Sequence, residues 1–247
     1  MKAIRILVIF SLNWLPKNIK WQLLKIRFLK KRLRICFEKT RRSCLIPKGT
    51  ILVIGGNDGL SFDNLFQQIS SSQINGLVLE PSQKYYNLLK RNLENFPNLV
   101  LLPIALHMTG RNLPLYQLNE QGLKKMPNWG QGLGSFSKDH LLQYDCLTES
   151  DLEVEWVQTK SFMQVIEENC LKKVDYLQID TEGFDGEIIK MIDFKCFNTR
   201  LLKFEWANLS SKEIEEIKVI LKKEKFFLDF HGGDCLGYSQ SVNPWFY

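Results

Sequence analysis

The stretch Thr50–Gly59, with the sequence Thr-Ile-Leu-Val-Ile-Gly-Gly-Asn-Asp-Gly, most constrains what this chain can fold into. Its apolar, mostly β-branched run Ile51–Ile54 is typical of a strand covered on both faces, as in a parallel sheet. Apolar residues then recur at helical spacing, which predicts a helix after the glycines; these residues are Phe62, Leu65, Phe66 and Ile69. A strand, a glycine turn and a helix start form a site for a nucleotide-like ligand, because glycines permit close approach and free amides point at the ligand.

The spacing of the glycines and of the next acidic residue limits which class of ligand the site can bind. Asn57 stands where a dinucleotide-binding turn needs its second glycine, and no Gly-Lys-Ser/Thr follows as in a P-loop. The next predicted strand, Gly76–Glu80, ends in a carboxylate about 20 positions beyond the turn, where an acidic residue binds ribose hydroxyls. The pattern therefore favours a nucleoside with a free ribose.

Further strands and helices alternate along the chain, which predicts an α/β fold. Residues 99–106 form a third strand that lies at a sheet edge or ends at Leu102, because Pro103 cannot donate to a ladder. Residues 113–116 are expected to form a short hairpin arm. The glycine-rich stretch 119–140 is interpreted either as a cover on the substrate side or as a disordered insertion.

The second half of the chain predicts two more strands that end in carboxylates. Val174–Asp180 ends in Asp180, with Glu182 just beyond, and Leu201–Trp206 contains Glu205 near its end. Carboxyl ends of parallel strands border the crevice where such sheets bind ligands. The last two predicted strands, 226–230 and 235–238, flank a turn and form an antiparallel pair.

These segments resemble the FkbM family of S-adenosylmethionine-dependent methyltransferases. The matching pieces are Ile54-Gly55-Gly56-Asn57-Asp58-Gly59, Leu79-Glu80-Pro81 and Gln178-Ile179-Asp180-Thr181-Glu182-Gly183. The resemblance covers residues 50–238 and implies a Rossmann-like class I methyltransferase fold, with a mostly parallel seven-stranded sheet and a final antiparallel hairpin. The chain departs from the family pattern at Val53, where an acidic residue is usual, and at Gln178, where lysine is usual.

The resemblance also implies roles for particular residues. The cofactor-binding residues are Gly55, Gly56, Asn57, Asp58, Gly59, Glu80 and Pro81. Asp180, Glu182 and His231 are the catalytic candidates on the acceptor side, with Glu205 behind them. Glu182 can instead cap a helix, and His231 can simply be a turn residue. Three scattered histidines do not suggest a metal site, so none is predicted.

Charge is distributed unevenly along the chain. Residues 1–50 hold 14 Lys and Arg against one acidic residue, Glu38, so the remainder is mildly acidic although the net charge is +6. An acidic domain argues against a nucleic-acid-binding surface. We therefore expect a basic, partly apolar helical extension over residues 1–48 and a methyltransferase domain over residues 49–247.

The basic extension leaves two interpretations open. Residues 21–34 interleave apolar and basic side chains, which suits either a helix packed on the domain or a helix lying on an anionic membrane surface. The apolar run at residues 4–15 is too short and interrupted to span a membrane, and no small-residue cleavage site follows it. The six scattered cysteines fit a reducing compartment, so we expect a cytoplasmic or membrane-peripheral protein.

Taken together, the expected function is methyl transfer from S-adenosyl-L-methionine to a hydroxyl of a sugar or secondary metabolite. The expected partner is a small-molecule or glycan acceptor and not a nucleic acid. An alternative is an inactive membrane-peripheral scaffold protein that keeps the fold, and its support is Val53, Gln178 and the basic extension. A nicotinamide-dependent oxidoreductase is disfavoured by Asn57 in the glycine turn.

Overall fold

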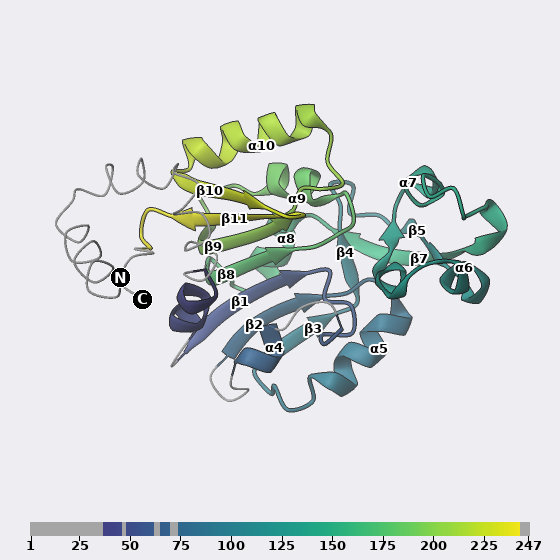
Figure 1. Ribbon diagram of the computed structural model, residues 1–247. Coiled ribbons are helices and arrows are strands. Elements are labelled where there is room, and N and C mark those ends of the chain that lie inside the picture. Colours follow the sequence, from purple (N-terminus) through teal and green to yellow (C-terminus); the bar gives the residue numbers. More distant parts are fainter. Residues whose placement is uncertain (1–36, 46–47, 62–64, 70–73, 243–247) are drawn as a thin grey trace, which may run out of the picture.

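A twisted sheet of seven strands forms the centre of the protein (Figure 1). The structure, a computed structural model, describes residues 37–45, 48–61, 65–69 and 74–242. The sheet order is β10-β11-β9-β8-β1-β2-β3. The bounds are β1 Gly49–Ile54, β2 Ile74–Leu79, β3 Leu99–Leu102, β8 Lys173–Ile179, β9 Asn198–Glu205, β10 Phe226–His231 and β11 Asp234–Ser239.

Only β11 runs against the other strands of this sheet. It pairs antiparallel with both β10 and β9, whereas β1 pairs parallel with β2 and β8. The predicted fold class and the final antiparallel hairpin are therefore confirmed. All carboxyl ends of the parallel strands meet at one edge, which is where Glu80, Asp180 and Glu205 emerge.

Helices cover both faces of the sheet and enclose two apolar cores. One face carries α8 Phe162–Glu168, α9 Asp185–Met191 and α10 Ser211–Lys223. The other carries α4 Leu65–Gln68, α5 Gln83–Asn92 and a helix over residues 37–45. A capping box begins α10, since Ser210 Oγ accepts a hydrogen bond from the Glu213 amide and the Glu213 carboxylate accepts one from the Ser210 amide.

The chain leaves the central sheet at Pro103 and enters a second sheet. β3 is the edge strand predicted from Pro103, and it ends at Leu102. The second sheet has the order β4-β7-β5-β6, with bounds β4 Ile104–Leu106, β5 Leu113–Leu118, β6 Gly134–Ser135 and β7 Leu152–Lys160. The prediction of a hairpin arm at 113–116 was wrong, because β5 pairs with the distant β7 and not with β4.

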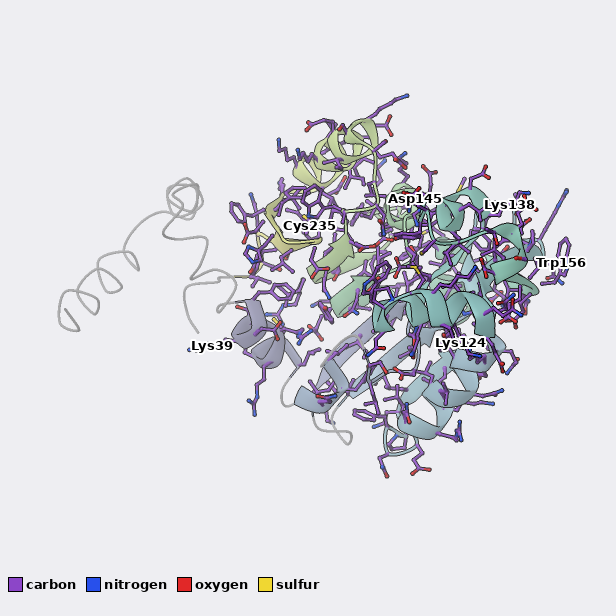
Figure 2. All side chains as sticks on the ribbon, turned by 45° about the vertical axis from the view of Figure 1, so that its right-hand side comes forward. Lys39, Lys124, Lys138, Asp145, Trp156 and Cys235 are labelled. Atoms are coloured by element: carbon purple, nitrogen blue, oxygen red, sulfur yellow. The ribbon has the colours of Figure 1, made fainter. Side chains whose placement is uncertain are left out.

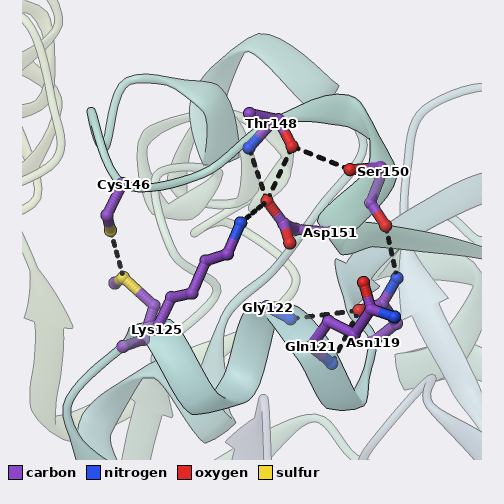
Figure 3. Close-up of polar contacts among 9 residues, drawn as sticks. Asn119, Gln121, Gly122, Lys125, Cys146, Thr148, Ser150 and Asp151 are labelled. Atoms are coloured by element: carbon purple, nitrogen blue, oxygen red, sulfur yellow. Dashed lines mark hydrogen bonds and ion pairs between the residues drawn. The ribbon is translucent and has the colours of Figure 1, made fainter.

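The glycine-rich stretch 119–140 is ordered into short elements, so the interpretation as a disordered insertion was wrong. These elements are α6 Glu120–Lys125, the 3₁₀ helix Asn128–Gly132, β6 and α7 Lys138–Leu142. Buried Asp151 accepts hydrogen bonds from the Thr148 amide and hydroxyl and from Lys125 Nζ (Figure 3). Asn119 caps α6 and also donates to the Ser150 carbonyl. Contacts between residues far apart in sequence stabilise this segment, which explains why its sequence shows no helical or strand periodicity.

The helix over residues 37–45 belongs to the packed core of the domain. Phe37 is 2% exposed and meets Tyr176 and Tyr238 edge-on, and Leu45 is fully buried. The predicted membrane-surface segment at residues 21–34 lies outside the described residues. Within the part of the chain that the structure describes, no helix is long and apolar enough to span a membrane.

Candidate active site

The glycine turn after β1 packs directly against the end of β8. Gly55 has φ +83°, and a Cβ on it would lie 1.8 Å from the carbonyl oxygen of Asp180. A Cβ on Gly56 would lie 2.5 Å from Val78 Cγ1. No larger residue fits these two positions, and their closeness brings Asp180 alongside the turn.

The backbone amides of the turn are satisfied within the protein. Gly55 and Gly56 both donate to the Leu79 carbonyl, at 3.0 and 2.9 Å, and the Asn57 amide donates to Glu80 Oε2 at 2.7 Å. Asp58 Oδ1 accepts from the two amides that follow the turn. The amides of the turn are therefore not free to bind a ligand, and the turn contributes close approach and oriented side chains instead; residues 62–64, where the helix was expected to start, lie outside the described residues.

Glu80 joins the glycine turn to the end of β2 through hydrogen bonds. Its side chain is buried, with Oε2 bonded to the Asn57 amide and Oε1 accepting from the Ser82 amide at 2.9 Å. Burial raises the pKa of Glu80 to about 7, although the two amide hydrogen bonds act in the opposite direction. A buried carboxylate with unused lone pairs can accept hydrogen bonds from a polar ligand.

Two adjoining cavities meet at the carboxyl ends of the strands. The larger has a volume of about 350 Å³ and is lined by the turn, Glu80 and the acidic residues of β8 and β9. The smaller, of about 80 Å³, is more apolar, with Leu115, Phe136 and Phe184 among its lining residues. Gly55, Asn57, Glu80, Gly132, Asp180 and Glu182 line both.

Asp180, Glu182 and Glu205 line the larger cavity together with the turn and form an acidic wall. Asn208 Nδ2 lies between two of its carboxylates and donates to Glu205 Oε2 at 2.8 Å and Glu182 Oε2 at 3.3 Å. Burial, followed by the negative charges of Glu205 and Asp180, raises the pKa of Glu182 to about 8. Burial and the charge of Asp180 raise that of Glu205 to about 7. Two predicted residues, Asp180 and Glu182, are thus brought together with Glu205.

Asp185 holds this acidic wall in place, and sequence reasoning missed it. Its fully buried carboxylate accepts hydrogen bonds from the Thr181 amide and hydroxyl and, 20 residues further on, from the Glu205 amide at 2.9 Å. One side chain thereby fixes the ends of both β8 and β9. In the sequence it reads as an ordinary acidic residue at a helix start.

Of the other residues predicted for the site, some line the cavities and His231 does not. Pro81 lines the smaller cavity, and Asp58 and Gly59 line the larger one. His231 lies at the exposed end of β10 and lines neither cavity. β11 separates β10 from β9, so the structure does not bring His231 to the carboxylates.

Residues of the second sheet and of its short helices line both cavities, so the stretch 119–140 covers the site, as one of its two interpretations predicted. The rings of Trp129 and Tyr144 are tilted against each other with centroids 5.5 Å apart, and both residues line the larger cavity. His140 lies over Gly183, whose added Cβ would come within 3.0 Å of the imidazole. Trp156, on β7, is exposed on the outer surface of the protein, at the right-hand side of the view in Figure 2.

The residues present fit S-adenosylmethionine. This molecule carries a cationic sulfonium and a ribose with two free hydroxyls, and the larger cavity offers carboxylates to both. Among the described residues, no Lys or Arg lines either cavity, so no basic side chain there would repel the cationic sulfonium. Glu80 and the glycine turn would hold the nucleoside part. No group of three or more His, Cys, Asp or Glu able to hold a metal ion occurs among the residues that the structure describes.

Solved structures similar to this chain are methyltransferases of low sequence identity. Methyltransferase FkbM from Methylobacillus flagellatus shares 11% identity with a TM-score of 0.46, over 80% of this chain and 47% of that one. A methyltransferase from Geobacter sulfurreducens shares 13% identity with a TM-score of 0.43, over 96% of each chain. A precorrin-6y C5,15-methyltransferase from Geobacter metallireducens shares 11%, with a TM-score of 0.40 over 83% and 84%. No curated protein matches the sequence significantly.

The strand order and the site together define a class I methyltransferase that uses S-adenosyl-L-methionine. The model of the Methyltransferase FkbM domain matches residues 54–228, which is more than half of the chain. The chain therefore belongs to the FkbM methyltransferase family, and the resemblance seen in its sequence is confirmed. The alternative of an inactive scaffold protein gains no support from these comparisons.

Proposed function

We propose that this enzyme methylates a hydroxyl group on a small-molecule or glycan acceptor, such as a sugar or secondary metabolite. The bound cofactor supplies an activated methyl group on its sulfonium. The protein must then hold the acceptor beside it and remove the hydroxyl proton. The acidic wall of the larger cavity supplies groups suited to both tasks.

The carboxylates of Glu182 and Glu205 carry this proposal. Their pKa values of about 8 and about 7 lie near neutral pH, where a general base works best. Asn208 holds the two side chains by donating to both. A carboxylate whose pKa is raised by burial accepts a proton more readily than an exposed one, so either residue can take the proton of a hydroxyl.

The charge of the cavities supports a neutral or cationic acceptor. Asp58, Glu80, Asp180, Glu182 and Glu205 line the larger cavity, and none of the described residues lining either cavity is basic. Phosphate groups would be repelled by these carboxylates. This charge pattern supports our proposal that the acceptor is not a nucleic acid.

The test is an S-adenosylhomocysteine production assay with three acceptor panels: neutral hydroxylated sugars and metabolites, primary amines, and RNA. We expect turnover with hydroxylated acceptors alone. Glu182→Gln and Glu205→Gln should each lower kcat, whereas the exposed Glu94→Gln should not. Turnover only with amines or RNA would overturn the proposal.

We also propose a cytoplasmic location, with peripheral membrane contact through residues 1–48 as the arrangement to test. The support is the basic sequence of this segment. Pelleting with anionic liposomes should compare the full chain with a Lys30→Gln, Lys31→Gln, Arg32→Gln variant. Equal pelleting of the two proteins would end the membrane proposal.

A further inference from the structure

The side chain of Gln178 links the interior of the protein to the larger cavity. It is 3% exposed and lines that cavity. Its Oε1 accepts a hydrogen bond from the Tyr176 hydroxyl at 2.8 Å, and the two residues share one face of β8 because they are two positions apart. The amide nitrogen, on the other side of the same planar group, makes no hydrogen bond to any other described residue.

The helix over residues 37–45 holds Tyr176 in place. Tyr176 is fully buried, with Phe37 edge-on at 6.2 Å and the guanidinium of Arg41 5.6 Å from its ring centroid. Arg41 in turn pairs with Glu38 at 2.6 Å. This packing holds the Tyr176 ring in place, and the hydrogen bond from its hydroxyl orients the Gln178 carboxamide.

The bound cofactor requires a hydrogen-bond donor in this cavity. The amino-acid part of S-adenosylmethionine ends in a carboxylate, which must meet N–H or O–H donors when it leaves water. The cavity is rich in carboxylates and has no Lys or Arg among its described lining residues. The amides of Gly55, Gly56 and Asn57 are already bonded within the protein. The Gln178 amide is an N–H donor that remains available.

We propose that Gln178 donates a hydrogen bond to the carboxylate end of the bound cofactor. Tyr176 and the helix over residues 37–45 are positioning elements that orient this donor. The helix preceding β1 thus supports the binding site through Tyr176 although none of its residues lines either cavity.

Calorimetric titration with two ligands tests the proposal. S-adenosylhomocysteine contains the carboxylate, whereas 5′-methylthioadenosine has the same nucleoside but lacks the amino-acid part. Gln178→Met should weaken binding of S-adenosylhomocysteine by about tenfold, and Tyr176→Phe by roughly threefold to tenfold. Neither variant should change the affinity for 5′-methylthioadenosine. Tyr86→Phe is the matched control, because its hydroxyl donates to the Leu101 carbonyl and the residue lines neither cavity.

Two results would overturn the proposal. Unchanged affinity of both variants for S-adenosylhomocysteine would remove Gln178 from the site. An equal loss for both ligands would show general damage to the cavity and not a missing contact to the carboxylate. No acceptor enters the titration, so its outcome is independent of whether the enzyme methylates hydroxyl groups.

Discussion

Val53 and Gln178 are direct partners in the parallel register between β1 and β8. These are the two positions at which the chain departs from the residues usual in its family, where an acidic residue and a lysine are expected. The two departures therefore lie side by side on adjacent strands. An apolar residue and a neutral amide occupy these positions, and the Tyr176 hydroxyl donates a hydrogen bond to the amide oxygen.

A double-mutant cycle tests whether these positions act as a pair. Val53 is 2% exposed, so Val53→Asp alone should destabilise the protein by about 3 kcal/mol through an unpaired buried carboxylate. Adding Gln178→Lys should recover roughly 1–3 kcal/mol relative to the sum of the two single changes. Urea unfolding of the four proteins measures both quantities. Additive effects would show that the two sites are independent.

Glu80→Ala should weaken cofactor binding by about tenfold or more and destabilise the protein by roughly 1–3 kcal/mol. The first effect follows from the loss of an acceptor in the cavity, and the second from two amide donors, of Asn57 and Ser82, left without their partner. Titration with S-adenosylhomocysteine and thermal unfolding measure them separately. The exposed Glu94→Ala serves as the control, and an unchanged affinity of Glu80→Ala would remove Glu80 from the site.

Gly55→Ala should destabilise the protein far more than Gly232→Ala, although both glycines have positive φ values, +83° and +59°. The strain of the left-handed conformation costs about 1–2 kcal/mol at either position. A Cβ at Gly55 also meets the Asp180 carbonyl at 1.8 Å, whereas nothing lies within 4 Å at Gly232. We expect Gly55→Ala to cost at least about 2 kcal/mol more in chemical denaturation. Equal losses would contradict the packing of the turn on β8.

Glu182 makes the stability of the protein depend on pH. Its pKa is about 8 in the folded protein and is raised from 4.5, so the folded state holds this proton more tightly than the unfolded state does. Its contribution is fully present below pH 4.5 and is lost as the pH rises toward 8. Glu182→Gln should therefore raise the melting temperature at pH 8 relative to the parent protein. Melting curves between pH 4 and pH 9 should show this gain shrinking at the acidic end.

Asp185→Ala should destabilise the protein by about 3 kcal/mol or more, because three buried donors lose their acceptor. It should also lower kcat, since the ends of β8 and β9 carry Asp180 and Glu205. Asp185→Asn keeps one acceptor oxygen and is expected to lose less stability. An Asp185→Ala protein with full activity would show that the acidic wall does not depend on this side chain.

The central fold could be predicted because its signals are local. The strand before Gly55 and the carboxylates that end three strands each occupy a few consecutive residues. The second sheet could not be predicted in this way, because β5 and β7 are far apart in sequence. Its helices are too short to show periodicity and depend on partners such as Asp151.

The site likewise contains residues that could be predicted from the sequence and residues whose role depends on the fold. Glu80 and Asp180 were identifiable from their places at strand ends, and both line the cavities. The role of Asn208 and Asp185 arises only when β8 and β9 lie side by side. His231 was misleading because its turn signal says nothing of the strand order, which places β11 between it and the acidic residues.

The position of β11 has a consequence for synthesis on the ribosome. β10 is made before β11 but touches the rest of the sheet only through it. Only Gly232 and Gly233 separate β10 from β11, so the two strands leave the exit tunnel almost together, and until then β9 has an unpaired edge. Such an edge can recruit strands from other chains. Nascent chains that pause before this hairpin emerges should therefore be prone to aggregation.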